Sequence, residues 1–203
     1  MKLNWMEWMV VNSLPRALFQ RLVTGRRLRR MGGRTEGLTA LEVGCGRGVG
    51  IGIIRSLFGA RQVDGFDLDP GMVRLSVRRH RGAGGRVRLW VGNAAALPVR
   101  DEVYDAVFDF GIIHHVGPWR EAFQEIYRVL RPGGRLYVEE IQRRFIVHPF
   151  WRRIFRHPQE DRFDHGQLVQ ALDACGFEVI SDAEMLDAFS WVAAVKPPAA
   201  GRR

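Results

Sequence analysis

The chain has 203 residues and a formal net charge of +9, with 46% hydrophobic and 26% charged residues. This length and composition fit one globular domain that can bury a core. Its two cysteines, Cys45 and Cys175, stand in different contexts, which excludes a disulfide framework and a cysteine metal site. No stretch approaches the roughly 20 apolar residues that cross a bilayer, and signal-peptide features are lacking. We therefore expect a cytoplasmic protein that holds no metal.

The basic residues are unusual in kind, because every one except Lys2 and Lys196 is an arginine. Such a uniform bias is typical of coding composition spread over many solvated faces. The charge is therefore weak evidence for a nucleic-acid partner. Peripheral contact with a membrane stays open, and the sequence does not indicate an oligomeric state.

In chain order, residues 5–30 predict an N-terminal helical region that is interrupted near Pro15. From residue 39 onward, short apolar runs alternate with helical stretches, the pattern of a mostly parallel sheet covered on both faces. Strands are expected over residues 39–43, 62–67, 86–91, 105–110, 135–141, 177–180 and 189–195, and helices over 49–58, 70–81, 120–130 and 166–175. The sequence thus predicts an α/β fold.

Within this single domain we expect five parts. A helical extension (1–36) precedes the core (37–141), and a basic, aromatic-rich insertion (142–162) precedes the last helix and strands (163–196) and a tail (197–203). The extension and the insertion are expected to form a lid over a substrate, in which Trp5, Trp8, Phe150 and Trp151 line or roof the pocket. Aromatic and arginine side chains interleaved in this way also suit an anionic aromatic ligand, an anionic lipid or nucleic-acid bases. A simple packed cap with solvated arginines is the alternative.

A glycine-rich turn follows the first strand. It contains Gly44, Cys45, Gly46 and Gly48. Glycines let the backbone turn tightly while a ligand approaches closely. The dinucleotide fingerprint is incomplete, because Val49 stands where its third glycine should be. Glu42, just before the turn, repels a pyrophosphate but suits the positively charged amino group of a methionine moiety.

An acidic residue, Asp67, ends the second strand. At this place in a Rossmann-like sheet a carboxylate accepts hydrogen bonds from both hydroxyls of a ribose. Leu68 follows directly and is expected to lie beside the same ligand. Asp69 is better explained as the N-cap of the helix that begins at Pro70.

These motifs resemble those of the class I S-adenosylmethionine-dependent methyltransferases, specifically the group that includes ubiquinone and menaquinone biosynthesis methyltransferases. The resemblance covers about residues 38–141 and includes the stretches 91–98, 103–110 and 130–136. It implies a Rossmann-like sheet of seven strands with the last strand antiparallel and helices on both faces. The implied cofactor, S-adenosyl-L-methionine, would lie across the carboxyl ends of the strands.

The resemblance also implies roles for residues after the third and fourth strands. Asn93 stands where the family commonly has an aspartate that reaches the adenine amino group, and an amide oxygen can still accept that hydrogen bond. The backbone of Ala94 would meet a ring nitrogen. Asp109 and Phe110 would lie beside the methionine part of the cofactor.

Candidate groups for the methyl acceptor follow the fourth and fifth strands. His114 and His115 are candidate catalytic bases for a hydroxyl or phenol, although such a pair can simply pack or bond locally. Glu139 and Glu140 could position an amine or hydroxyl, with solvated edge charge as the alternative. We therefore predict methyl transfer to a small hydrophobic or aromatic acceptor, a quinone precursor or a lipid-like molecule. An RNA or protein methyltransferase and a non-catalytic cofactor-binding regulator are the alternatives.

Overall fold

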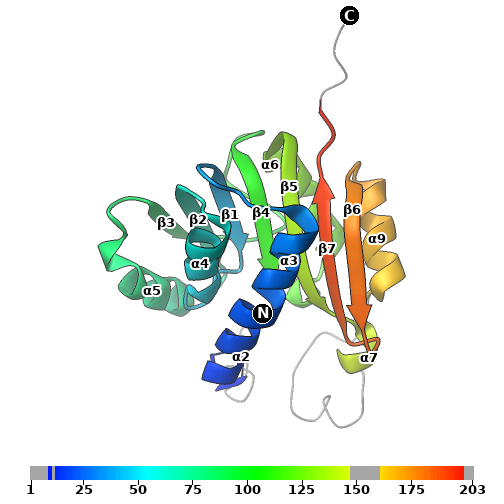
Figure 1. Ribbon diagram of the computed structural model, residues 1–203, viewed down its shortest axis with the longest axis horizontal. Coiled ribbons are helices and arrows are strands. Elements are labelled where there is room, and N and C mark those ends of the chain that lie inside the picture. Colours follow the sequence, from blue (N-terminus) through cyan, green and yellow to red (C-terminus); the bar gives the residue numbers. More distant parts are fainter. Residues whose placement is uncertain (1–8, 11, 147–160, 199–203) are drawn as a thin grey trace, which may run out of the picture.

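The computed structural model describes residues 9–10, 12–146 and 161–198, and its centre is a seven-stranded sheet (Figure 1). The strand order is β3-β2-β1-β4-β5-β7-β6. The strands are β1 (Thr39–Val43), β2 (Gln62–Asp67), β3 (Val87–Val91), β4 (Tyr104–Phe110), β5 (Leu130–Ile141), β6 (Glu178–Met185) and β7 (Phe189–Val195). The first five strands are parallel, whereas β7 runs antiparallel between β5 and β6. The predicted Rossmann-like sheet with an antiparallel last strand is confirmed.

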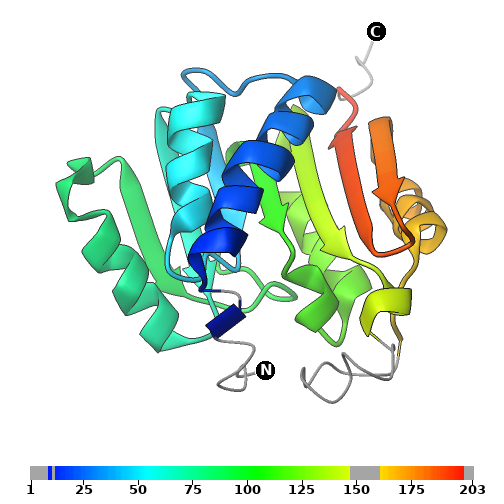
Figure 2. The same ribbon diagram turned by 60° about the horizontal axis from the view of Figure 1, so that its bottom comes forward.

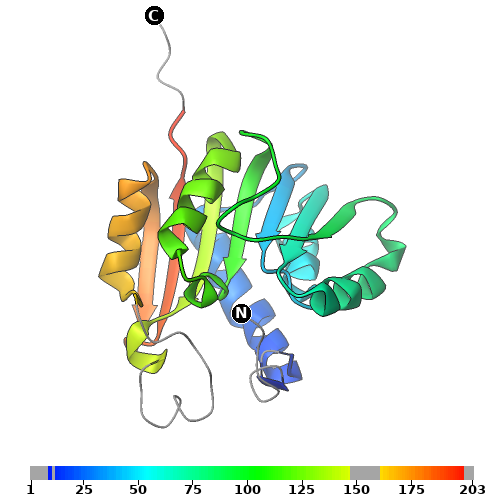
Figure 3. The ribbon, with the colours of Figure 1, turned by 180° about the vertical axis from the view of Figure 1, so that it is seen from behind.

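Helices cover both faces of this sheet. They are α2 (Leu14–Phe19), α3 (Gly25–Gly32), α4 (Val49–Ile53), α5 (Pro70–Arg79), α6 (Trp119–Val129), α7 (Arg143–Ile146) and α9 (His165–Ala174). Two π-helical segments, η1 (Gln20–Thr24) and η2 (Ile54–Phe58), continue α2 and α4. Figure 1 shows α3 and α4 in front of the sheet, and Figure 3, from behind, shows α6 and α9 in front of it.

Each face has its own apolar core. On one face Trp119, Phe123 and Leu168 lie buried against the sheet, while on the other Leu28 and Phe58 do so. Strand β1 runs between these cores, and its apolar residues are buried on both sides, as expected for the middle strand of a covered parallel sheet. None of the described helices is long and apolar enough to span a membrane.

The N-terminal helical region forms one nearly continuous rod from Leu14 to Gly32 that crosses the sheet (Figure 2). Ser13 caps its start, and Pro15 stands in the first turn, where a missing N–H costs nothing. At its far end the hydroxyl of Tyr137 donates to the carbonyl oxygens of Gly32 (2.8 Å) and Gly33 (3.1 Å). The extension is therefore tied to the middle of β5.

The largest differences from the sequence prediction are at the start of β5 and the end of β6. Helix α6 ends at Val129, close to the predicted end at residue 130, but β5 already begins at Leu130, although we expected the strand to begin at residue 135. The Pro-Gly-Gly stretch forms an irregular start to β5, where the register to β4 shifts between Tyr104 and Ala106. Strand β6 continues to Met185 because pairing with β7 extends it beyond its apolar start.

Candidate functional site

The glycine-rich turn lies between β1 and α4 at the carboxyl edge of the sheet. Gly44, Gly46 and Gly48 all have positive φ angles, which favour glycine. A side chain at Gly44 would overlap Ile112, and one at Gly48 would press on Ser76 and His80. A Cβ at Gly46, in contrast, would meet nothing within 4 Å. The first and third glycines thus allow packing, whereas Gly46 faces open space that a ligand can fill.

Asp67 faces the same turn from the end of β2. Its Oδ2 accepts a hydrogen bond from the Gly46 amide (2.9 Å), and its Oδ1 accepts one from the Asp69 amide (2.9 Å). Burial raises the pKa of this carboxyl group above its usual range. Each carboxylate oxygen can accept a second hydrogen bond, so the geometry is compatible with the predicted ribose contact. Asp69 caps α5 by accepting from the Gly71 amide (2.7 Å), as predicted.

Glu42 lies buried beneath the start of α4. A Cβ at Gly50 would overlap its Oε1, so the glycine there makes room for the carboxylate. Burial raises the pKa of Glu42 well above its usual range, although the Ile51 amide partly offsets this by hydrogen bonding. Its Oε2 has no hydrogen-bond partner in the described part of the chain. A buried acceptor of this kind calls for a donor from water or a bound ligand.

Apolar and amide groups border the open space beyond Asp67. Leu68 is 56% exposed, which is unusual for a leucine next to a buried strand. Asn93 is exposed, and its Oδ1 accepts from the Ala95 amide (3.1 Å), which leaves a second lone pair. Ala94 is buried. An exposed aliphatic side chain near an amide suits a flat, hydrogen-bonding base such as adenine, and these contacts stay predictions.

Cys45 stands apart from the other residues of the turn. Its side chain is buried in the core, and its amide donates to the Phe66 carbonyl (2.7 Å). Burial raises the pKa of its thiol. The predicted cofactor contact of Cys45 stays a prediction, and burial in the core is the role that its geometry supports.

Asp109, at the end of β4, is fully buried beside Phe110. Its Oδ1 accepts from the Ile112 amide (3.0 Å), and its Oδ2 finds no donor among the described residues. Burial and the nearby Glu140 raise the pKa of Asp109 well above its usual range. Glu42, Asp67 and Asp109 lie at the carboxyl ends of three neighbouring strands. The charges of Asp67 and Asp109 raise the pKa of Glu42 further. Such an edge attracts a cation.

Glu139 binds the N-terminal helix. Both its oxygens accept from the Arg16 guanidinium at 3.0 Å, and Oε1 also accepts from the Thr24 hydroxyl (2.9 Å). Arg16 additionally donates to the Phe110 carbonyl (3.2 Å). The sequence indicated neither Arg16 nor Thr24 as part of the site. Glu139 therefore holds the N-terminal extension at the carboxyl edge of the sheet, on the side where the methyl acceptor is expected to bind.

Glu140 binds His114. Its Oε2 lies 2.6 Å from His114 Nδ1, and its Oε1 accepts from the His114 amide (3.2 Å). Burial raises the pKa of Glu140 to about 7. The His114 carbonyl accepts a hydrogen bond from Arg162, a second contact that the sequence did not indicate. Solvated edge charge, the alternative considered for Glu139 and Glu140, is wrong because both carboxylates are buried and bonded.

The two histidines follow each other in a short 3-10 turn after β4. Their ring centroids lie 4.1 Å apart. His114 is 2% exposed, whereas the His115 side chain is partly accessible. His115 is therefore better placed than His114 to contact a methyl acceptor, while the hydrogen bond with Glu140 fixes the His114 ring.

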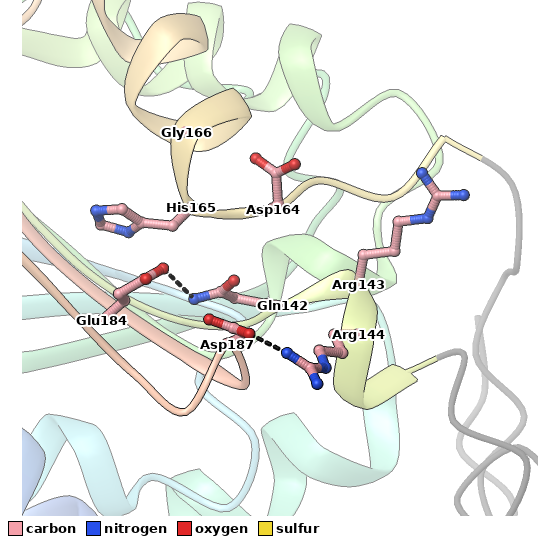
Figure 4. A pocket seen from close by; sticks show the side chains of 8 residues that line it. All are labelled: Gln142, Arg143, Arg144, Asp164, His165, Gly166, Glu184 and Asp187. Carbon is pink, nitrogen blue, oxygen red and sulfur yellow. Dashed lines mark hydrogen bonds and ion pairs between the residues drawn. The ribbon is translucent and has the colours of Figure 1, made fainter.

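A hollow of about 550 Å³ lies farther along the same edge, beyond the end of β5 (Figure 4). It is lined by Gln142, Arg143, Arg144, Asp164, His165, Gly166, Glu184 and Asp187. Charges of both signs line it, and Arg144 pairs with Asp187 across its mouth. The predicted lid aromatics, Trp5, Trp8, Phe150 and Trp151, lie outside the described residues.

This arrangement fits S-adenosylmethionine. The cofactor carries two positive groups, its sulfonium and its amino group, and the edge offers the buried acceptor Glu42 Oε2 together with Asp109 Oδ2. Gly46 leaves room beside Asp67 for a sugar. Within the described residues, no group of His, Cys, Asp and Glu side chains could hold a metal ion.

Comparisons with known proteins agree with this fit. A family model described as a methyltransferase domain matches residues 41–138. A probable S-adenosylmethionine-dependent methyltransferase of Mycolicibacterium smegmatis is 34% identical over 151 residues, which cover 74% of this chain and 56% of the relative. A fatty-acid O-methyltransferase of the same organism is 34% identical over 118 residues, covering 58% of this chain and 42% of the relative. The chain thus spans about half the length of the curated relatives it matches.

A solved structure extends the likeness to nearly the whole chain. It is a complex of the Haloferax volcanii Trm112 methyltransferase activator with a putative methyltransferase. The match has a TM-score of 0.76 at 18% identity and covers 97% of this chain and 99% of that one. At this identity the match shows the fold. The matched family model and the relative from Mycolicibacterium smegmatis show that residues 41–138 form a methyltransferase domain of the S-adenosylmethionine-dependent kind.

Proposed function

We propose that the protein transfers a methyl group from S-adenosylmethionine to an oxygen of a small, hydrophobic, lipid-like acceptor. The observation that carries this proposal is the buried Glu140–His114 pair behind the accessible ring of His115. An oxygen acceptor with a proton to lose needs a base near neutral pH, and histidine is the side chain that titrates there. The likeness to a fatty-acid O-methyltransferase supports a lipid-like acceptor. Membership of the ubiquinone and menaquinone group stays a prediction.

The cofactor supplies an electrophilic methyl group on its sulfonium, so the protein chiefly aligns the acceptor and excludes water. Glu42, Asp67 and Asn93 would hold the cofactor, which would supply its methyl group to the acceptor oxygen and become S-adenosylhomocysteine. The proton of that oxygen passes to the imidazole of His115. Glu140 accepts from His114 Nδ1 and fixes this ring, against which the His115 ring packs. In this scheme His115 is the catalytic base and His114 is a positioning residue.

The activity is tested by incubating the full chain with radiolabelled cofactor and an acceptor panel. The panel contains a fatty acid, a long-chain alcohol, a phenolic quinone precursor, an amine and total RNA. We expect label in the lipid extract as an ester or ether. Label in RNA or protein would contradict the proposal, and so would cofactor binding without turnover of any acceptor.

The two histidines are tested separately. His115→Asn should lower kcat by roughly 100-fold or more, because a general base contributes about that much, while cofactor affinity stays the same. His114→Asn should lower kcat less, since it disturbs only the orientation of the neighbouring ring. Equal turnover in both variants and the wild type would mean that neither histidine takes the proton.

A further inference from the structure

The outer face of the N-terminal helices carries exposed leucines. Leu14, Leu18 and Leu22 are spaced four residues apart, so they form one stripe along α2 and η1. Their side chains are 69%, 47% and 47% exposed. The opposite face of the same helices is already occupied, since Gln20 and Thr24 are buried there. This helix thus has an apolar side toward the solvent as well as a side packed on the sheet.

Unpaired positive charge accompanies the leucine stripe. The sequence from residue 8 to residue 35 contains arginines but no Asp or Glu. Three of its arginines have partners: Arg16 binds Glu139, Arg27 lies over the Trp191 ring, and Arg34 pairs with Glu36. Arg21, Arg26 and Arg30 are exposed and make no ion pair with any described residue. Their charges are therefore available to an anionic partner.

The helix carrying this surface is fixed at the acceptor edge of the sheet. Figures 1 and 3 both show α2 reaching past the carboxyl end of β4, where His114 and His115 follow. The Arg16–Glu139 contact holds the helix in this position. Exposed leucines therefore stand at its tip, next to the predicted acceptor site, with Arg21 among them. Arg26 and Arg30 follow along the rod toward the end that Tyr137 holds.

We infer that this surface, defined by Leu14, Leu18, Leu22, Arg21, Arg26 and Arg30, docks on an anionic lipid membrane. A helix with leucines on one side and arginines around them lies in the interface, with leucines among acyl chains and guanidinium groups at the phosphates. Nucleic acid would use the arginines but would leave the leucines in water. The leucine stripe therefore favours a lipid surface over a nucleic acid.

Docking in this way would present the acceptor edge to the membrane. A lipid-like acceptor could then reach His115 without crossing water. This inference rests on the proposed function only where it takes the membrane as the source of the methyl acceptor. Membrane binding itself needs neither cofactor nor turnover. Vesicle binding and methyl transfer are therefore measured in separate experiments.

The test measures binding of the full chain to sedimented vesicles without cofactor. One set contains phosphatidylcholine alone, and the other contains added phosphatidylglycerol. We expect binding to the anionic vesicles that weakens as salt rises, and little binding to the neutral ones. Replacing the three arginines by glutamine should lower affinity about 100-fold, roughly fivefold for each charge. Leu18→Ser, which leaves the charge unchanged, should lower it by about fivefold.

Two matched controls separate this surface from the general positive charge of the chain. Val77, near the end of α5, is 47% exposed like Leu18, so Val77→Ser removes an equally accessible aliphatic side chain away from this surface. Arg55, Arg61 and Arg86 line a hollow of about 840 Å³ near the amino ends of β2 and β3, at the opposite edge. Their replacement by glutamine removes the same charge, and we expect both controls to bind vesicles nearly as the wild type does.

Four results would overturn the inference. The first is an absence of binding to anionic vesicles. The second is an equal loss in the control variants, which would mean that net charge alone drives binding. The third is full competition of RNA with vesicles. The fourth is that the leucines instead hold two copies together, as Leu18→Ser would reveal by converting a dimer to a monomer in sedimentation. Cofactor affinity in each variant confirms that the domain stays folded.

Discussion

The cofactor side and the methyl-acceptor side of the carboxyl edge are held together by different kinds of contact. On the cofactor side, contacts join residues that are close in sequence, such as Gly46 with Asp67 and Asp67 with Asp69. On the acceptor side, Arg16 reaches Glu139 and Thr24 reaches the same carboxylate, across more than 100 residues. Local contacts of the first kind leave a motif in the sequence. The second kind exists only after the N-terminal helices have packed on the sheet.

This difference indicates which part of the site can change its specificity for the methyl acceptor. The cofactor site is made by turns of the core sheet, whereas the methyl-acceptor side also depends on the N-terminal helices. Changes in those helices can therefore alter the methyl-acceptor side without disturbing the cofactor site. If this division holds, variants on one side should leave the other side's readout almost unchanged. Four predictions test it.

The largest effect is expected within the glycine-rich turn itself. Gly44→Ala would place a Cβ against Ile112 at a positive φ, and should lower the free energy of unfolding by about 3 kcal/mol. Gly46→Ala has the same backbone strain but no clash, and should cost roughly 1 kcal/mol. Its methyl group would enter the cofactor space, so cofactor affinity should fall. Chemical denaturation and calorimetry measure both, and unchanged cofactor affinity in Gly46→Ala would refute the assignment of Gly46 to the ligand.

Asp67→Ala should weaken cofactor binding by about 2–3 kcal/mol, because it removes a charge-assisted acceptor from the ribose. Two backbone amides also lose their acceptor, so a stability loss of roughly 1 kcal/mol is expected as well. Asp69→Ala is the control, since it removes only the cap of α5 and should lower stability by about 1 kcal/mol. Calorimetric titration compares the two. Unchanged affinity in Asp67→Ala would rule out the ribose contact.

Arg16→Gln removes the ion pair with Glu139 and so changes the methyl-acceptor side of the edge alone. It leaves the buried Glu139 carboxylate with the Thr24 hydroxyl, and should lower the free energy of unfolding by about 1–3 kcal/mol. Adding Glu139→Gln should restore part of that loss, because the uncompensated charge disappears. Cofactor affinity should stay within about twofold in both variants. A loss of cofactor binding without a loss of stability would show that the two sides are not separate.

The smallest effect is the dependence on pH. Glu140 has a pKa raised to about 7, and burial raises the pKa values of Glu42, Asp67 and Asp109. The folded protein therefore holds protons more tightly than the unfolded chain, and its stability from these groups falls as pH rises from about 4.5 through 7. A cationic cofactor favours the ionised carboxylates, so its affinity should rise several-fold over the same range.

The uncharged sulfur of S-adenosylhomocysteine provides the matched comparison for this prediction. Its affinity should change less with pH than that of S-adenosylmethionine, measured by calorimetry between about pH 6 and about pH 8, roughly one unit to either side of 7. A variant Glu42→Gln should flatten part of the wild-type dependence, because it removes a titrating carboxyl group from the cofactor side. Identical pH profiles for both ligands would show that the carboxylates do not sense the sulfonium charge.

Much of the fold was readable from the sequence, because periodicity and turn residues are local signals. Strands such as Gln62–Asp67 and Phe189–Val195 end where their patterns end. The irregular start of β5 was not predicted, because its register depends on pairing with β4. The cap at Asp69 was predicted, since a cap needs only neighbouring backbone amides.

The sequence by itself predicted an α/β fold, the glycine-rich turn and the acidic residue that ends β2. These depend on backbone freedom and short loops that any chain with these residues adopts. Tertiary structure alone decided which carboxylates are available. Glu139 is bound by Arg16, Glu140 is bound by His114, and Glu42 Oε2 is buried with no hydrogen-bond partner among the described residues. The physical reason is that the burial and pairing of a charge depend on the residues that the fold brings beside it, often from more than 100 positions away.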